Sequence, residues 1–459
     1  MVLFLTGIVA IFFVGLALAS LRRPAYAFAL TLVMYPYEQL LQSQFPFFIA
    51  HRSFMNYLTA AVAGVAVAAA MLQGRRTIML DRISALVAAL YLFIITSAIW
   101  SVNPGLSWFT IRYWIPYMIA GAVILPLTIS SPRDVRAAVK GFLIAGTPLI
   151  IALAIAPMRG RGLVLLNEDS LEQGNPLAVG TFGAEMAILA VGSMLAQRRP
   201  PHIRALLLVV AALGAFVILR TGSRGQLLAA MAGIIGVSFA VLNGASRRNF
   251  LVAFVPACIL LGAVVLLKDA FVSSAGGGWI ERRWSLETMQ ETFEKSRLQM
   301  ASELLYEFLS AAGRNPLILV GGLGAASSYQ LIGYYCHVVP VEALCEYGFI
   351  GLILYGMILW ATVRSLWLMV KSKRLSVEDK TQAAFMAGLF AVYFLLTFKQ
   401  GSLFGHTEYF ATAMMIGRLR TVTLAPSVQA VSAVPAVAHV RPAAPAMPPF
   451  AMPSAKVPT

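Results

Sequence analysis

The chain has 459 residues, of which 59% are hydrophobic and only 12% are charged. Soluble domains carry about twice that share of charged residues, so the composition and the mean hydropathy of +0.79 exclude an ordinary soluble protein. The net charge of +16 comes from short clusters of Lys and Arg between apolar runs. Such clusters encode membrane topology and argue against a nucleic-acid partner.

Apolar runs long enough to cross a bilayer, about 20 residues each, recur along the chain. Ten of them precede residue 268, at 2–20, 24–45, 54–72, 84–100, 114–130, 138–156, 176–196, 203–219, 225–243 and 249–267. Two more lie at 339–363 and 382–398, and a shorter run at 403–417 is a further candidate. We therefore expect an all-α polytopic membrane protein with about 12 to 13 transmembrane helices.

The loops between these runs alternate in charge, because every second loop carries Lys or Arg. The positive-inside rule places the basic loops in the cytoplasm and the N-terminus outside. The loops at 157–175, 220–224 and 268–338 then share the outer side. The first run has no basic residues before it, which favours an uncleaved helix over a signal peptide.

The sequence divides into four regions. Transmembrane helices fill 1–267, an outer loop spans 268–338, further transmembrane helices fill 339–420, and 421–459 form a tail. The tail is rich in Pro, Ala and Val without helical or strand period, so we expect it to be disordered. One amphipathic helix is predicted in the loop, because apolar residues recur at Leu298, Ala301, Leu305, Phe308 and Ala312 with polar residues opposite.

Two arginines, Arg220 and Arg224, lie four residues apart between two spans. An arginine at membrane depth costs roughly 2.5 to 3.5 kcal/mol, which favours a functional role such as binding an anion. A continuous helix would place both on one face, whereas a break at Gly222 would turn the N-terminus of the next helix toward the anion. Alternatively, both side chains snorkel to the interface or pair with carboxylates at 168–172.

Other polar residues lie beside the spans on the outer side. His337 is a candidate general base, because an imidazole titrates near neutral pH. Glu342 and Glu346 are carboxylates in an apolar span and require partners. For Glu346 these include His337, an arginine, or a helix-packing hydrogen bond. Residues near the end of the last long span were interpreted as interface anchors, namely Lys399, His406 and Glu408.

The order of these motifs resembles the O-antigen ligase and Wzy-type polymerase superfamily. The resemblance covers roughly residues 160–365. It rests on the order, the spacing and the shared outer side of Thr221-Gly222-Ser223-Arg224-Gly225, Arg297 in the amphipathic helix, Asn315-Pro316, Gly322-Leu323-Gly324, His337, and Glu346-Tyr347-Gly348-Phe349-Ile350-Gly351.

The resemblance implies a GT-C-like glycosyltransferase of the bacterial inner membrane, with its active site facing the periplasm. It implies an undecaprenyl diphosphate-linked glycan donor, a glycan or lipid acceptor, and a chain-length regulator as a further partner. Arg224 and Arg297 correspond to the family's arginines and His337 to its loop histidine, and Arg161 becomes a second phosphate candidate. Many members carry His-Asn where this chain has His337-Val338, which puts the acceptor type in doubt.

Transfer from a diphosphate carrier creates a leaving group with growing negative charge, which requires either a metal ion or fixed cations. No Asp-x-Asp motif occurs in the sequence. We therefore expect an inverting, metal-independent transferase without a cofactor, in which Arg224 and Arg297 bind the diphosphate and His337 activates the acceptor. Arg220, Arg161 and Glu346 are expected to contribute to substrate binding, and a polymerase is preferred to a ligase.

Two other classes of function compete with this hypothesis. One is a membrane transporter of a polyprenyl-linked or anionic glycan, although transporters often show internal repeats and none is evident. The other is a binding or scaffold protein. This class would be favoured if the arginines and the loop histidine proved dispensable for function.

Overall fold

The computed structural model describes residues 1–74, 80–159, 162–165, 174–196, 200–242 and 297–424. The predicted span at 249–267 and the predicted tail beyond Leu424 lie outside these ranges. The N-terminal helices are α1 (Val2–Arg22), α2 (Ala25–Gln42), α3 (Pro46–Ala50), α4 (Phe54–Leu72), α5 (Arg82–Ser97), α6 (Pro104–Ile119), a π-helical turn (Ala120–Ile124), α7 (Leu125–Thr128) and α8 (Pro132–Ile155).

A two-residue hairpin, β1 (Met158–Arg159) and β2 (Gly162–Leu163), follows α8. The central helices are α9 (Pro176–Ala196), α10 (Pro201–Arg220) and α11 (Arg224–Leu242). After the gap come α15 (Arg297–Arg314), α16 (Leu317–Gly321), α17 (Ser327–Ile332), α18 (Val339–Lys371), α19 (Val377–Leu396), a 3-10 turn (Leu403–Gly405) and α20 (Thr407–Leu424).

Seven helical segments of the described residues are long and apolar enough to cross a membrane. They are Val2–Arg22, Phe54–Leu72, Pro104–Thr128, Pro132–Ile155, Pro176–Leu195, Pro201–Arg220 and Val339–Lys371. The chain is therefore a multi-pass, all-α membrane protein, as predicted. The remaining predicted spans that the structure describes are helical but shorter or more polar. A physical reason is visible in α20, where every residue from Tyr409 to Leu419 is buried by other helices and need not be apolar.

The span predicted at 114–130 begins too late. The helix starts at Pro104, ten positions earlier, and includes Trp108 and Arg112, which the sequence reading placed in a loop. Asn103 caps this helix because its side-chain oxygen accepts a hydrogen bond from the Leu106 N–H at 3.1 Å. An asparagine followed by proline is a strong helix-start signal that hydrophobicity alone overlooks.

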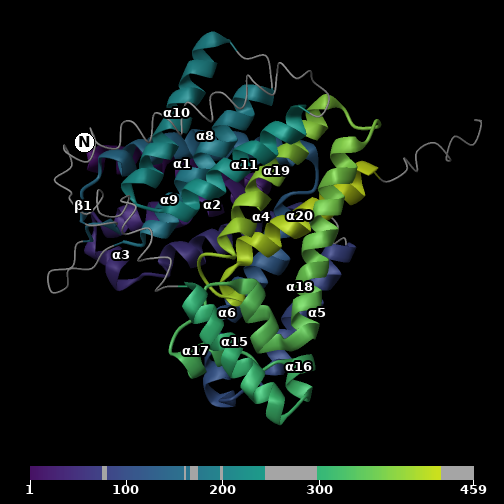
Figure 1. Cartoon of the computed structure of the whole chain (residues 1–459). Coiled ribbons are helices and arrows are strands. Elements are labelled where there is room, and N and C mark those ends of the chain that lie inside the picture. Colours follow the sequence, from purple (N-terminus) through teal and green to yellow (C-terminus); the bar gives the residue numbers. More distant parts are fainter. Residues whose placement is uncertain (75–79, 160–161, 166–173, 197–199, 243–296, 425–459) are drawn as a thin grey trace, which may run out of the picture. The chain divides into compact units, whose positions relative to one another are not determined.

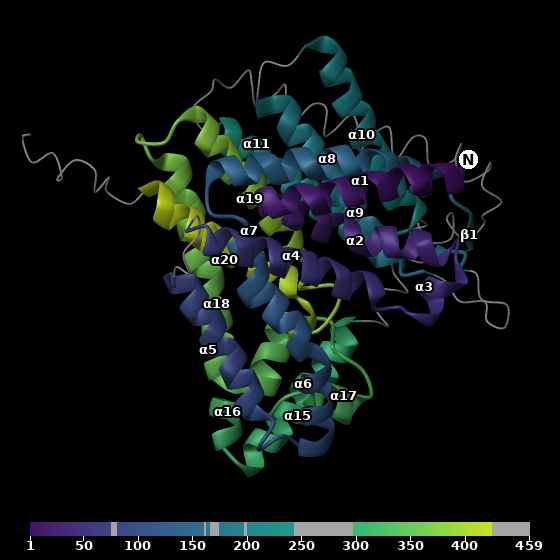
Figure 2. The ribbon, with the colours of Figure 1, turned by 180° about the vertical axis from the view of Figure 1, so that it is seen from behind.

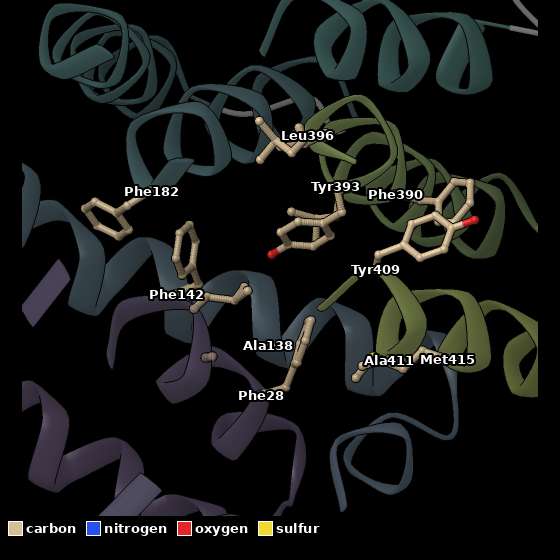
Figure 3. Close-up of a cluster of buried hydrophobic side chains, with 14 of the residues drawn as sticks. Phe28, Ala138, Phe142, Phe182, Phe390, Tyr393, Leu396, Tyr409, Ala411 and Met415 are labelled. Carbon is tan, nitrogen blue, oxygen red and sulfur yellow. The ribbon is translucent and has the colours of Figure 1, made fainter. Parts of the chain in front are cut away.

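The helices pack as a bundle in which α19 contacts α8, α9, α11 and α20, while α18 contacts α5, α19 and α20. Figure 1 shows α8, α9, α10, α11 and α19 running side by side, and Figure 2 shows α1, α2 and α4 on the other side of α8. The centre is aromatic, as Figure 3 shows, with the Phe142 and Phe182 rings 5.6 Å apart and the Phe390 and Tyr409 rings 5.2 Å apart.

The predicted amphipathic helix forms as α15 and packs on α16, α17 and α18 (Figure 1). Its buried face contains Ala301, Leu304, Phe308 and Ala312. Leu298, expected on that face, is 64% exposed at the first turn of the helix, and Leu304 is buried instead. The helix ends at Arg314, just before Asn315-Pro316, as the proline predicted.

The backbone around Gly322, just after α16, packs closely against a break in α18 at Gly348. Gly348 has a φ of +62° inside α18, and a Cβ there would lie 2.3 Å from the Val320 carbonyl oxygen. Gly322 has a φ of +75°, and a Cβ there would meet the Glu346 carbonyl oxygen at 2.2 Å. Both positions therefore require glycine, which gives the Glu346-to-Gly351 motif a structural role.

Loops predicted on the same side of the membrane contact each other. On the predicted cytoplasmic side, Arg23 donates to the Arg133 carbonyl at 2.6 Å, and Arg136 forms an ion pair with Glu378. On the predicted outer side, the Ser101 hydroxyl donates to the Ala325 carbonyl at 2.9 Å. These contacts are compatible with the topology that the charge pattern predicted.

Cysteine labelling tests the orientation. We expect Leu317→Cys to react with a membrane-impermeant maleimide in intact spheroplasts, and Val377→Cys to react only after permeabilisation. Both side chains are well exposed, at 74% and 79%, and lie on opposite predicted sides. Cys336 and Cys345 are buried, and Cys258 is replaced by Ala in the background. The reverse labelling pattern would invert the topology.

Candidate functional site

The chain breaks between α10 and α11 at the two arginines. Gly222 has a φ of +59°, and its N–H donates to the Leu219 carbonyl at 2.8 Å. The Ser223 N–H donates to the Ile218 carbonyl at 3.3 Å, which completes a Schellman turn. Arg220 therefore ends one helix and Arg224 begins the next, so the second of the two alternatives for this motif is the observed one.

Arg220 is bound to the end of another helix. Its guanidinium donates to the carbonyl oxygens of Leu153 at 3.0 Å, Ala154 at 2.7 Å and Ala156 at 2.7 Å. These carbonyls lie at the C-terminus of α8, where the last turn lacks intrahelical donors. The contacts give Arg220 a capping role that the sequence did not predict, and the carboxylates at 168–172 lie outside the described residues.

Arg224 lies at the N-terminus of α11, where helix geometry concentrates partial positive charge. The side chain is half-buried, and its Nε and Nη2 atoms are shielded from solvent. The next residue, Gly225, admits Lys399 from the end of α19, because a Cβ at Gly225 would lie 1.7 Å from the Lys399 Cδ. The Lys399 ammonium donates to Gln226 Oε1 at 2.9 Å. A second cation thus lies beside the Ser-Arg-Gly motif.

The segment from Thr397 to His406, here called the α19–α20 loop, joins this motif to His337. Gln226 Nε2 donates to Gln400 Oε1 at 2.8 Å. One residue later, the Gly401 carbonyl contacts His337 Nδ1 at 3.2 Å. Three segments far apart in sequence therefore meet on one loop.

His337 is held in an uncommon conformation. Its φ is +58°, in the left-handed region that residues other than glycine rarely occupy and that is enriched at functional sites. The Val339 N–H donates to the Thr397 carbonyl at 2.8 Å, which fixes the backbone two residues on. A proton on Nδ1, donated to Gly401, leaves the basic lone pair on Nε2.

A second histidine, His406, lies on the same loop and is only 7% exposed. Its Nε2 contacts the Gln400 carbonyl at 2.6 Å. Burial lowers the pKa of His406 to about 4, partly offset by this hydrogen bond, and the nearby His337 lowers the pKa further. His406 is therefore a neutral imidazole at pH 7. The sequence predicted His406 as an interface anchor and did not indicate this buried environment.

The described partners of Glu346 are neither His337 nor an arginine. Its carboxylate accepts hydrogen bonds from the Ala326 N–H at 2.9 Å, the Ser328 N–H at 2.9 Å and the Ser328 hydroxyl at 2.5 Å. It thereby anchors the turn before α17 to α18. The neighbouring Glu342 accepts from the Leu403 N–H at 2.9 Å and anchors the α19–α20 loop. Both carboxylates replace backbone hydrogen bonds that these turns lack.

The side chains of two arginines predicted to bind substrate lie outside the described part of the structure. Arg161 lies outside the described residues. Arg297 is the first residue of α15, and its side chain lies outside the described part of the structure. The structure therefore brings Arg224 and His337 to one loop, and assigns Arg220 and Glu346 contacts elsewhere.

A cavity of about 280 Å³ adjoins the α19–α20 loop. The loop contributes Gln400, Gly401, Gly405 and His406 to its wall. The rest of the lining comes from α2, the segment that begins α9, the end of α19 and the start of α20, namely Thr31, Leu32, Tyr35, Pro36, Asn175, Leu177, Ala178, Thr181, Phe182, Glu185, Tyr393, Leu396 and Glu408.

No protein-family model matches the chain, and no curated protein shows significant sequence similarity to it. The family resemblance thus rests on the sequence motifs alone. Among the described residues, no three His, Cys, Asp or Glu side chains gather closely enough to hold a metal ion.

Replacing Arg220 tests its capping role. We expect Arg220→Ala to lower the free energy of unfolding by about 2 kcal/mol, because three carbonyl oxygens lose a charged donor. Arg220→Lys should recover part of that loss. Thermal unfolding of the purified protein measures the effect, with the exposed Arg204→Ala on the same helix as control. If Arg220→Ala leaves the unfolding temperature unchanged and weakens substrate binding, the capping role is wrong and Arg220 is a substrate-binding residue.

The buried His406 predicts a pH dependence. In the unfolded chain its pKa is near 6.5, and in the folded protein it is about 4. Between these values the unfolded state binds a proton that the folded state does not, so stability falls as the pH drops from 6.5 toward 4. The loss should be on the order of 3 kcal/mol. The difference in unfolding free energy between wild type and His406→Gln, followed against pH, isolates this contribution. A constant difference would contradict it.

Proposed function

We propose that the chain is an inverting, metal-independent glycosyltransferase of a GT-C-like class, with its active site on the periplasmic face of the bacterial inner membrane. The donor is a glycan linked to a polyprenyl diphosphate. One observation carries the proposal. Through Gln400 the α19–α20 loop contacts Gln226, directly after the cationic Ser-Arg-Gly motif, and through Gly401 it contacts the candidate base His337.

The cationic side of the loop suits a diphosphate. Arg224 offers a planar fork that binds phosphate oxygens in pairs. Lys399 adds a compact positive charge next to it, and the N-terminus of α11 adds partial positive charge. Fixed cations in a partly dehydrated site stabilise the charge that grows on the leaving diphosphate without reorganising.

His337 would act as the general base. Its Nε2 takes the proton from an acceptor hydroxyl while the hydroxyl oxygen attacks the anomeric carbon. The bond between that carbon and the diphosphate oxygen breaks, and the diphosphate leaves with the electron pair. A single displacement of this kind inverts the configuration at the anomeric carbon.

The loop helix α15 supports the same site from outside. Tyr334, three residues before His337, donates its hydroxyl to Glu303 of α15 at 2.9 Å. The helix is therefore tied to the segment that carries the base. We propose that α15 covers the donor and acceptor during transfer.

Transfer assays with purified protein, a polyprenyl diphosphate-linked glycan and a glycan acceptor test the proposal. We expect Arg224→Ala and His337→Ala each to reduce kcat at least about a hundredfold, because each removes a group that acts in the transition state. Arg314→Ala and His51→Ala are matched controls, since both side chains are exposed and lie apart from the described site contacts.

EDTA should leave the rate unchanged. Loss of activity that a divalent cation restores would contradict the metal-independent mechanism. Wild-type rates in both alanine variants would contradict the residue assignments. Translocation of the donor without any new glycosidic bond would favour the competing transporter.

A further inference from the structure

The cavity beside the α19–α20 loop differs in charge from the segments that carry Arg224 and Lys399. Two carboxylates line it, Glu185 from α9 and Glu408 from the first turn of α20. None of the described residues that line it is Lys or Arg. His406, also in the wall, is neutral at pH 7 because burial lowers its pKa to about 4. The described lining therefore offers no positive charge to a diphosphate or to any other anion.

Glu185 points to a ligand with hydroxyl groups. It is only 3% exposed, and its Oε1 accepts a hydrogen bond from the Tyr393 hydroxyl at 2.6 Å. Figure 3 shows the Tyr393 ring reaching from α19 toward Phe142 and Phe182. The second oxygen, Oε2, accepts no hydrogen bond from any described residue. Because Glu185 lines the cavity, this oxygen is available to a hydroxyl group of a bound ligand.

Glu408 offers a second acceptor. It lies in the cavity lining and stays exposed there, at the N-terminal end of α20. The Thr407 hydroxyl is 3.3 Å from its Oε2. The lining also offers amides, from Asn175 and Gln400, and aromatic rings, from Tyr35 and Phe182. Carboxylates and amides that accept from hydroxyls, beside aromatic rings that stack on apolar C–H faces, match the chemistry of a sugar ring.

Size and ligand geometry separate a sugar from a metal ion. The volume of about 280 Å³ lies near the lower end of small-molecule pockets, about 300 Å³, and far exceeds the space of one ion. Cation sites also need several oxygen ligands around one point. No three acidic, histidine or cysteine side chains of the described residues converge in this way.

We propose that this cavity binds a neutral, hydroxyl-rich sugar ring and forms the acceptor subsite of the transferase, an inference that rests on the function proposed above. Gly401 connects the two places. It lines the cavity, and its carbonyl contacts His337 Nδ1 at 3.2 Å. Gly401 has no side chain that could cover this edge of the cavity. A sugar hydroxyl at that edge adjoins the imidazole, while the donor diphosphate occupies the cationic side.

Direct binding tests the sugar site without any donor. The full chain is placed in lipid nanodiscs free of glycoside detergent, and saturation-transfer NMR is recorded with methyl β-glucoside and with methyl β-glucuronide. We expect the neutral glucoside to bind and the anionic glucuronide to fail. Glu408→Gln and Glu185→Gln should each weaken binding about tenfold, since an amide nitrogen replaces one of the two oxygens that can accept from a sugar hydroxyl.

The variants keep the fold testable. Gln at position 185 still accepts the Tyr393 hydrogen bond through its carbonyl oxygen, and Glu307→Gln on α15 controls for loss of a glutamate outside the cavity. Equal binding of the glucuronide, absence of glucoside binding, or an unchanged affinity in both cavity variants would each overturn the inference.

Kinetics distinguish failure of this inference from failure of the proposed function. In the transfer assay, Glu408→Gln should raise the KM for the acceptor about tenfold and leave the KM for the donor unchanged. If transfer occurs and the acceptor KM does not change, the acceptor subsite is wrong while the transferase stands. If the glucoside binds but no transfer occurs, the transferase is wrong while the sugar site stands.

Discussion

The candidate site depends on the hydrogen bonds that fix the α19–α20 loop between helices. Inside an apolar bundle, irregular backbone must find its partners within the protein, because lipid offers none. Here the Thr397 carbonyl accepts from Val339, the Leu403 N–H donates to Glu342, and the Gln400 side chain accepts from Gln226. These bonds bind the loop to α18 and α11 at once. The same contacts that satisfy the loop therefore set the relative positions of the base and the cations.

The polar residues of the site divide into supports and reactive groups. Arg220 closes the end of α8, and Glu346 holds the turn before α17. Gly348 and Gly322 allow the backbone of that turn to touch α18. Arg220 and Glu346 thus form their hydrogen bonds with other parts of the fold, and the glycines permit close backbone packing. Arg224, Lys399 and His337 lie at helix ends or on the loop, where a substrate from the outer side can reach them in the proposed function.

The uneven charge around the α19–α20 loop gives the proposed reaction a direction. A diphosphate is attracted to the arginine and lysine and finds no cation among the described residues that line the cavity. A neutral sugar needs no cation and would form hydrogen bonds with Glu185 and Glu408. Electrostatics would thus direct the donor diphosphate to Arg224 and Lys399 and the acceptor sugar to the cavity before any chemistry begins.

The sequence by itself determined the membrane class, most helix positions, the sides on which loops meet, and α15, because hydrophobicity, periodicity and charge clusters are local properties. It also predicted that Arg224 and His337 belong together, through the family resemblance. Only the tertiary structure decided the partners of Arg220, Glu346, Lys399 and His406, and the acidic cavity. Gln226 and Gln400 are 174 positions apart, and Arg220 and Ala154 are 66 apart. Contacts at such separations arise from how helices pack, which no local pattern encodes.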